Sequence, residues 1–181
     1  MSSHEIEATV LDIKKEEIIN TLKSLGAIEV QDTRLTVDWY RLKGVKEGED
    51  PWFLRIRSKK EGTHEVTWKA KSSTEGVARK HKEINFAIAE PAKLAELFEE
   101  LDLEQYAHQE KDRVSLHYKD WKFDIDTYPG MPPYLEIEGK SDVHIQEAMK
   151  LLGLENNKTW NKGERILIQT VYGLDWYNMK F

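Results

Sequence analysis

The chain has 181 residues, of which 39% are hydrophobic and 33% are charged, and its formal net charge at pH 7 is -6. This length and composition, with six tryptophans and seven tyrosines, predict one compact globular domain and exclude an intrinsically disordered chain. The sequence has no cysteine, which excludes disulfides and cysteine-based catalytic or zinc sites and favours a cytoplasmic location, and its negative charge argues against broad binding to nucleic acid.

The N-terminal segment, MSSHEIEATV, lacks the basic and apolar regions of a signal peptide, and no later segment is apolar for long enough to cross a membrane. Residues 4–10 alternate between polar and apolar side chains, which predicts a strand. Apolar residues then recur at helical spacing, so we expect a helix that is capped by Asp12 and ends at Gly26.

Period-two alternation continues through most of the remaining chain. The segments expected to form strands are residues 33–42, 52–58, 64–71, 81–89, 111–119, 121–127 and 134–139. Two more helices are expected, one over residues 91–101 and one that is capped by Ser141 or Asp142 and ends at Gly153. From residue 160 to the end the pattern is ambiguous.

Each predicted strand has one apolar face and one ionised face, and the ionised faces are segregated by sign. The cationic pairs are Arg55 with Arg57, Lys69 with Lys71, and Lys111 with Arg113. The anionic pairs are Glu5 with Glu7, Asp124 with Asp126, and Glu136 with Glu138. Like charges two residues apart on one face repel each other, so the repetition suggests that each pair serves a ligand of opposite sign.

Two arrangements can explain these faces. In the ordinary one, every charged face points to water and every apolar face points to the core of a sandwich. In the other, the sheet closes into a barrel with the charged faces inside, where unpaired charges are costly and need water, a polyanion and metal ions. Cationic pairs suit phosphoryl oxygens, and carboxylate pairs suit Mg²⁺ or Mn²⁺.

Seven short motifs decide between the two, because their order resembles the CYTH, or triphosphate tunnel metalloenzyme, superfamily. They are EIEAT, LRIR, TWKAK, RKHKEIN, KDR, DIDTYPG and YLEIEG. The similarity is greatest to the branch that holds the class IV adenylate cyclases. It implies an α+β, mainly β fold: an eight-stranded antiparallel closed barrel with helices outside. We expect one domain over residues 1–181, with its core at about 4–154 and an uncertain tail at 155–181.

The resemblance also implies roles for the charged residues. The expected metal ligands are Glu5, Glu7, Asp126, Glu136 and Glu138, with Asp124 as a further candidate. The expected phosphate ligands are Arg55, Arg57, Lys69, Lys111 and Arg113, with Lys71 and Arg79 as further candidates. The residues expected to act most directly in catalysis are Glu5, Glu7, Lys69, Lys111 and Arg113. Glu83 is expected to face the tunnel. None of the six histidines has paired ligand spacing, so no zinc site is expected.

One position departs from the family pattern: Thr9 stands where the ExExK motif has a lysine. Thr9 keeps the inward parity but cannot supply charge, so the departure allows a changed substrate, reduced turnover or a binding protein without catalysis. Three functions therefore stay open. The first is metal-dependent hydrolysis of ATP, thiamine triphosphate or tripolyphosphate, the second is conversion of ATP to cyclic AMP and pyrophosphate, and the third is non-catalytic binding of a nucleotide or polyphosphate. The family makes a homodimer an additional expectation.

Overall fold

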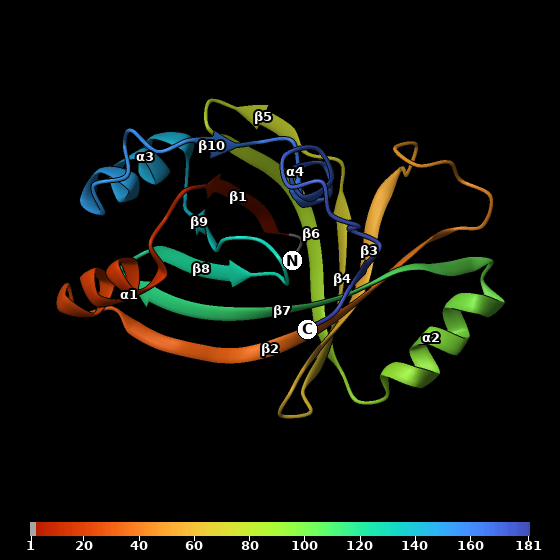
Figure 1. Cartoon of the computed structure of the whole chain (residues 1–181). Coiled ribbons are helices and arrows are strands. Elements are labelled where there is room, and N and C mark those ends of the chain that lie inside the picture. Colours follow the sequence, from red (N-terminus) through yellow and green to blue (C-terminus); the bar gives the residue numbers. More distant parts are fainter. Residues whose placement is uncertain (1–2) are drawn as a thin grey trace.

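The computed structural model describes residues 3–181, which form a closed antiparallel barrel of eight strands with helices outside it (Figure 1). The expected fold is therefore confirmed. The barrel strands are β1 (Ser3–Val10), β2 (Ile28–Leu42), β3 (Trp52–Lys59), β4 (His64–Ala70), β6 (Ala78–Ile88), β7 (Leu103–Tyr118), β8 (Trp121–Thr127) and β9 (Tyr134–Glu138). The helices are α1 (Lys15–Ser24), α2 (Pro91–Glu100), α3 (Asp142–Leu151) and α4 (Glu164–Thr170). Three short strands complete the sheet: β5 (Ser73–Glu75), β10 (Thr159–Trp160) and β11 (Asn178–Met179).

The N-terminal strand closes the barrel. Around it the strand order is β1-β9-β8-β7-β2-β3-β4-β6, and β6 pairs with β1 again. Glu5 of β1 lies opposite His81 of β6, while Glu7 lies opposite both Arg79 of β6 and Glu138 of β9. Side chains alternate across a strand, so this register places the ionised residues of β1 together inside the barrel.

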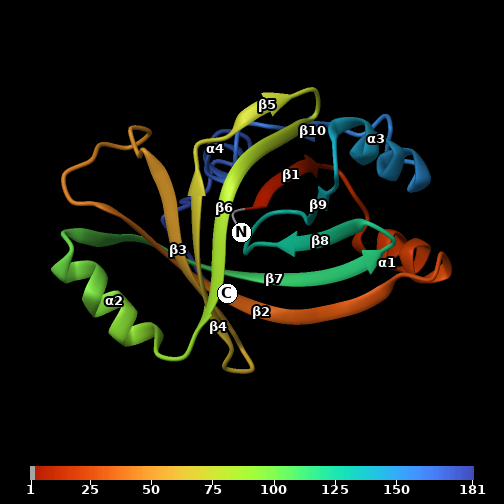
Figure 2. The ribbon, with the colours of Figure 1, turned by 180° about the vertical axis from the view of Figure 1, so that it is seen from behind.

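The apolar faces of the strands pack outward against the helices. Helices α1 and α3 lie at one side of the barrel and α2 lies at the other (Figures 1 and 2). Leu22 of α1 and Ile145 of α3 belong to one buried cluster with Phe123 of β8, and Phe98 of α2 belongs to another with Ile56 of β3. The helices thus supply the core, and the barrel interior is left to polar side chains.

Several element ends differ from the expected ones. Helix α1 starts at Lys15, because Asp12 adopts a left-handed backbone conformation (φ 58°) and makes no cap. Strand β2 starts five residues before the expected start, and β7 eight residues before its own. These two strands pair along their whole length with shifts in register at two places, which break the regular alternation on which the sequence prediction relied. The Ser141 cap of α3 is confirmed: its hydroxyl accepts a hydrogen bond from the His144 amide at 3.2 Å.

Across residues 3–181, no helix combines the length and the apolar character that a membrane span requires.

Candidate functional site

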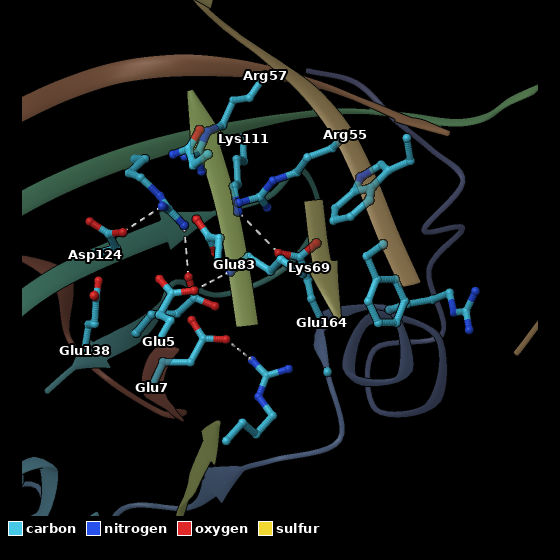
Figure 3. Close-up of a pocket in the computed structure, with 18 of the residues that line it drawn as sticks. Glu5, Glu7, Arg55, Arg57, Lys69, Glu83, Lys111, Asp124, Glu138 and Glu164 are labelled. Atoms are coloured by element: carbon cyan, nitrogen blue, oxygen red, sulfur yellow. Dashed lines mark hydrogen bonds and ion pairs between the residues drawn. The ribbon is translucent and has the colours of Figure 1, made fainter. Parts of the chain in front are cut away.

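A cavity of about 220 Å³ lies inside the barrel and is lined by side chains of both charges (Figure 3). The cations that line it are Arg55, Arg57, Lys69, Arg79, Lys111, Arg113, Lys122, Lys162 and Arg165. The carboxylates are Glu5, Glu7, Glu83, Asp124, Glu136, Glu138 and Glu164. Most of these residues come from the ionised strand faces that the sequence singles out, which the closure of the sheet turns inward.

Several arginines of the cavity have side-chain nitrogens without hydrogen-bond partners. Within residues 3–181, Nε of Arg55, Nη1 of Arg57 and Nε of Arg79 are buried and form no hydrogen bond with the protein. Buried donors are normally satisfied, since leaving one unpaired costs about 1–3 kcal/mol. An anion with several oxygens would supply the missing acceptors, and guanidinium groups suit phosphoryl oxygens.

Glu5 lies at the centre of a cluster of ionisable groups. Its Oε2 accepts a hydrogen bond from Lys69 Nζ at 2.6 Å and lies 2.7 Å from Nε2 of His81. Lys69 Nζ also lies 2.7 Å from Oε2 of Glu83. Burial alone would raise the pKa of Glu5, but the Lys69 ammonium and the hydrogen bond with His81 outweigh it and lower the pKa to about 2. Glu5 is therefore ionised at neutral pH and held next to a cation.

Arg113 joins three carboxylates on the opposite wall. Its guanidinium donates to Asp124 and Asp126 at 2.6 Å each and to Glu136 at 2.9 Å. Lys111 Nζ donates to Asp126 at 2.7 Å. Burial would raise the pKa of Asp126, yet Arg113 and Lys111 hold it well below its usual range. Asp126 is fully buried behind these two cations, so it orients them and does not itself line the cavity.

The pKa of Glu136 is shifted in the opposite direction from that of Glu5. Burial, together with the negative charges of Glu7 and Asp126, raises its pKa to about 7 in spite of Arg113. The pKa of the neighbouring Glu138 is also raised, by burial and by Glu5. The carboxylates on this side of the cavity thus repel one another, and a divalent cation among them would relieve that repulsion.

This shifted pKa predicts a pH dependence of stability. In the folded protein Glu136 keeps its proton up to about pH 7, whereas a carboxyl group with the ordinary pKa of 4.5 loses its proton at lower pH. The folded state binds more protons in this window, so the contribution of Glu136 to the free energy of unfolding falls as pH rises from 4.5 to 7. The side chain is largely buried, and the loss amounts to about 2–3 kcal/mol.

We expect Glu136→Gln to remove this decline, because the amide does not titrate. Urea unfolding in a chelating buffer measures the free energy of unfolding across this pH range. Between pH 4.5 and 7, the stability of the variant relative to the unmodified chain should increase by about 2 kcal/mol. The substitution Glu99→Gln, at an exposed position on α2, serves as the control and should leave the pH profile unchanged. Parallel profiles for Glu136→Gln and the unmodified chain would contradict the prediction.

Three of the residues expected in the tunnel do not line it. Asp126 lies behind Arg113, as described above. Lys71 is exposed, since β4 ends at Ala70 and the alternation of faces ends with it. Thr9 is buried, with 3% of its surface exposed, and is paired with Glu136 on one side and Trp160 on the other.

The C-terminal tail supplies site residues that were not predicted from the sequence. Residues 162–166, around the start of α4, line one end of the cavity. The carboxylate of Glu164 lies 3.2 Å from Lys111 Nζ, and it accepts hydrogen bonds from the Tyr134 hydroxyl at 2.9 Å and from Trp176 Nε1 at 3.3 Å. Four aromatic residues line the cavity as well: Trp39, Phe53, Tyr106 and Trp176. A weak signal for this region was present in the tryptophans of an otherwise irregular tail.

The donor set fits a hard divalent cation. Glu5, Glu7, Glu136 and Glu138 all present carboxylates to the cavity, and oxygen ligands are those that Mg²⁺ and Mn²⁺ prefer. Glu5, His81 and Glu83 also bring their ligand atoms within 4.8 Å of one another. His81 itself is buried and does not line the cavity, so its observed role is to hold Glu5.

Comparison with known proteins identifies the family. Residues 3–161 match the CYTH domain, and the chain therefore belongs to the CYTH domain family. A search of curated proteins gives no significant match. Residues 162–181, with α4 and Trp176, lie beyond the matched region.

Solved structures share the fold at low sequence identity. The PH1012 protein from Pyrococcus horikoshii OT3 is 21% identical with a TM-score of 0.70, over 85% of this chain and 94% of its own. A candidate adenylate cyclase from Vibrio parahaemolyticus is 13% identical with a TM-score of 0.74, over 94% of this chain and 100% of its own. A candidate adenylyl cyclase from Hippeastrum, described as having a dominant triphosphatase activity, is 11% identical with a TM-score of 0.65, over 93% of this chain and 94% of its own.

Proposed function

We propose that this protein hydrolyses a triphosphate that binds in the tunnel together with Mg²⁺ or Mn²⁺. The observation that carries the proposal is the unpartnered state of buried atoms on Arg55, Arg57 and Arg79, which belong to a cavity that is also lined by carboxylates. Arg79 donates to Glu7 at 2.9 Å, so cations and carboxylates meet in one cavity, and this mixture suits a polyanion and a metal ion bound side by side. The CYTH family and the triphosphatase activity attributed to the Hippeastrum protein support the same reaction class.

The cations of the cavity would bind the phosphate oxygens. Arg55 and Arg57 offer bidentate contacts, while Lys69 and Lys111 offer point charges. Water attacks the terminal phosphorus, the bond to the bridging oxygen breaks, and orthophosphate and a diphosphate leave. The negative charge that develops on the equatorial and leaving oxygens is stabilised by groups that are already in place, which is the main source of catalysis in phosphoryl transfer.

The carboxylates would hold the metal. Glu5, Glu7, Glu136 and Glu138 are the ligand candidates that line the cavity. The bound ion would neutralise phosphate oxygens and activate water. Asp124 and Asp126 would hold Arg113 in place, since both accept hydrogen bonds from its guanidinium.

Adenylate cyclase is the second candidate, and the aromatic end of the cavity favours it. Phe53 and Tyr106 line the same cavity as the cations, so a base could be held while the ribose hydroxyl attacks the α-phosphorus. That reaction releases pyrophosphate and a cyclic nucleotide. The non-catalytic binding that Thr9 allows would instead give binding without product.

Product analysis on the full chain distinguishes these functions. The purified protein is incubated with ATP, GTP, thiamine triphosphate or tripolyphosphate and either Mg²⁺ or Mn²⁺. We expect metal-dependent release of orthophosphate, lost in a Glu136→Ala, Glu138→Ala double variant and retained in a Glu99→Ala, Glu100→Ala control on the exposed face of α2. Cyclic AMP with pyrophosphate would identify a cyclase, and binding with no product would contradict both enzymatic assignments.

A further inference from the structure

One end of the tunnel differs in chemistry from the rest. On β3, the residues Phe53, Arg55 and Arg57 follow one another on the face that lines the cavity. The cationic section that suits phosphates therefore continues directly into an aromatic section. Tyr106 of β7 and Trp176 of the tail line the cavity as well. Because Trp176 lies beyond the region matched to the CYTH family, this end is partly built by the chain's own tail.

The aromatic side chains form two layers. Trp39 and Trp176 are buried, with 8% and 3% of their surfaces exposed, and their ring centroids lie 5.4 Å apart. Gln109 fixes both, because it accepts a hydrogen bond from Trp39 Nε1 at 2.8 Å and donates one to the Trp176 carbonyl at 2.7 Å. Phe53 and Tyr106 are only half-buried. The tryptophans thus form a rigid backing, and the two half-buried rings keep surface for contact with a ligand.

Positive charge lies next to three of these rings. The Arg55 guanidinium lies 5.4 Å from the ring centroid of Trp39, that of Arg41 lies 4.8 Å from Tyr106, and that of Arg165 lies 5.9 Å from Trp176. A cation attracted to an aromatic face already uses the electron density that a second cation would need, and it repels that cation directly. This end of the tunnel therefore disfavours a positively charged ring.

The carboxylates near this end do not offset that charge. Glu164 is engaged by Lys111, Tyr134 and Trp176. Asp50 is buried and faces Arg165 at 3.5 Å, and Glu104 accepts a hydrogen bond from Arg41 at 2.8 Å. Each of these carboxylates thus lies next to a cation, although Glu164 shares Lys111 with Asp126 and neither oxygen of Asp50 forms a hydrogen bond. A ligand group here meets apolar ring surface and guanidinium groups, which both stack against a neutral planar ring.

We propose that the aromatic end binds a neutral heteroaromatic ring joined to the triphosphate, so that the substrate is of the nucleoside triphosphate class. This inference rests on the proposed function. The ring contacts Phe53 and Tyr106, and the phosphates extend from there along Arg55 toward Arg57. Tripolyphosphate has no group for this end, and thiamine triphosphate brings a cationic ring to it.

Equilibrium binding to the full chain tests the inference. Isothermal titration calorimetry with Mg²⁺ would compare the non-hydrolysable, methylene-bridged analogues of ATP, thiamine triphosphate and tripolyphosphate. We expect the ATP analogue to bind about tenfold more tightly than either of the others, the size that one stacked base contributes. Equal affinity for the ATP and tripolyphosphate analogues, or tightest binding of the thiamine compound, would overturn the inference.

Two leucine substitutions locate the ring. Phe53→Leu and Tyr106→Leu keep apolar volume but remove the ring, and each should weaken binding of the ATP analogue about tenfold while changing that of the tripolyphosphate analogue less than twofold. Phe86→Leu, at a ring that is 58% exposed on β6, is the matched control and should change neither. Circular dichroism and thermal melting would verify that all three variants fold.

The failures of the two proposals are distinguishable. If the leucine variants weaken both analogues equally, the ring does not lie where we place it, although triphosphate binding in the tunnel stands. If the unmodified chain binds none of the three analogues, the proposed function is itself wrong and this inference fails with it.

Discussion

Replacing Arg113 by methionine should lower the free energy of unfolding by about 3–5 kcal/mol, the largest effect on stability that we expect from a single substitution in the tunnel. The Arg113 side chain is 7% exposed and donates hydrogen bonds to Asp124, Asp126 and Glu136. Methionine fills similar volume but leaves these carboxylates without their shared cation. The energetic cost is therefore that of buried negative charge that Lys111 and Lys122 compensate only in part.

Urea unfolding at pH 7 with metal chelated measures this effect. The matched control is Arg34→Met, which removes an arginine that also pairs with an aspartate, Asp112, at 2.8 Å. That pair is exposed, with 41% and 36% of the two side chains accessible, so its loss should cost under about 1 kcal/mol. If both variants lost the same free energy of unfolding, burial of the Arg113 network would make no difference to stability, and the prediction would be wrong.

The largest effect on activity is expected at Lys69. Its ammonium lies in the tunnel, 2.6 Å from Glu5 and 2.7 Å from Glu83. Under the proposed function, Lys69→Gln should lower kcat/KM for the preferred triphosphate about 10²–10³-fold, because it removes a preorganised charge from the proposed phosphate site. Steady-state phosphate release, measured beside circular dichroism of the same sample, separates lost catalysis from lost fold.

Lys71 provides the control for this substitution. It belongs to the same TWKAK motif, but it lies outside the tunnel and is exposed. Lys71→Gln should therefore change kcat/KM less than twofold. A loss at Lys71 comparable to that at Lys69 would mean that the strand extends beyond Ala70 when substrate is bound, and it would remove the basis for separating the two lysines.

These two lysines also show how far the sequence predicts the structure. Alternation placed Lys69 and Lys71 on one face of a strand, and the confirmed barrel turns that face inward. Where the strand ends depends on pairing with its neighbours, and β4 pairs with β6 only as far as Lys69, opposite Glu83. Periodicity gives the direction of a side chain within a strand, but tertiary pairing decides the length of the strand.

The C-terminal tail shows a second limit of prediction from the sequence. Glu164 and Trp176 contact Lys111 and Gln109 across the chain, and no local pattern of residues 160–181 encodes those partners. Charge segregation pointed to a barrel because it recurs from strand to strand, and the resemblance to the CYTH superfamily implied that barrel. A short helix of seven residues that docks by long-range contacts has no such repetition, so its position could be found only from the three-dimensional structure.

Closure of the barrel by its first strand has a consequence for how the chain folds. Strand β1 pairs on one side with β6 and on the other with β9, so that Glu7 meets Glu138. During synthesis, β1 cannot pair with β9 until most of the chain has been made, because β9 spans residues Tyr134–Glu138. Contacts this distant in sequence are associated with folding in milliseconds to seconds. We expect slow refolding, with α1, α3 and the β7–β8 hairpin forming before the tunnel exists as a binding site.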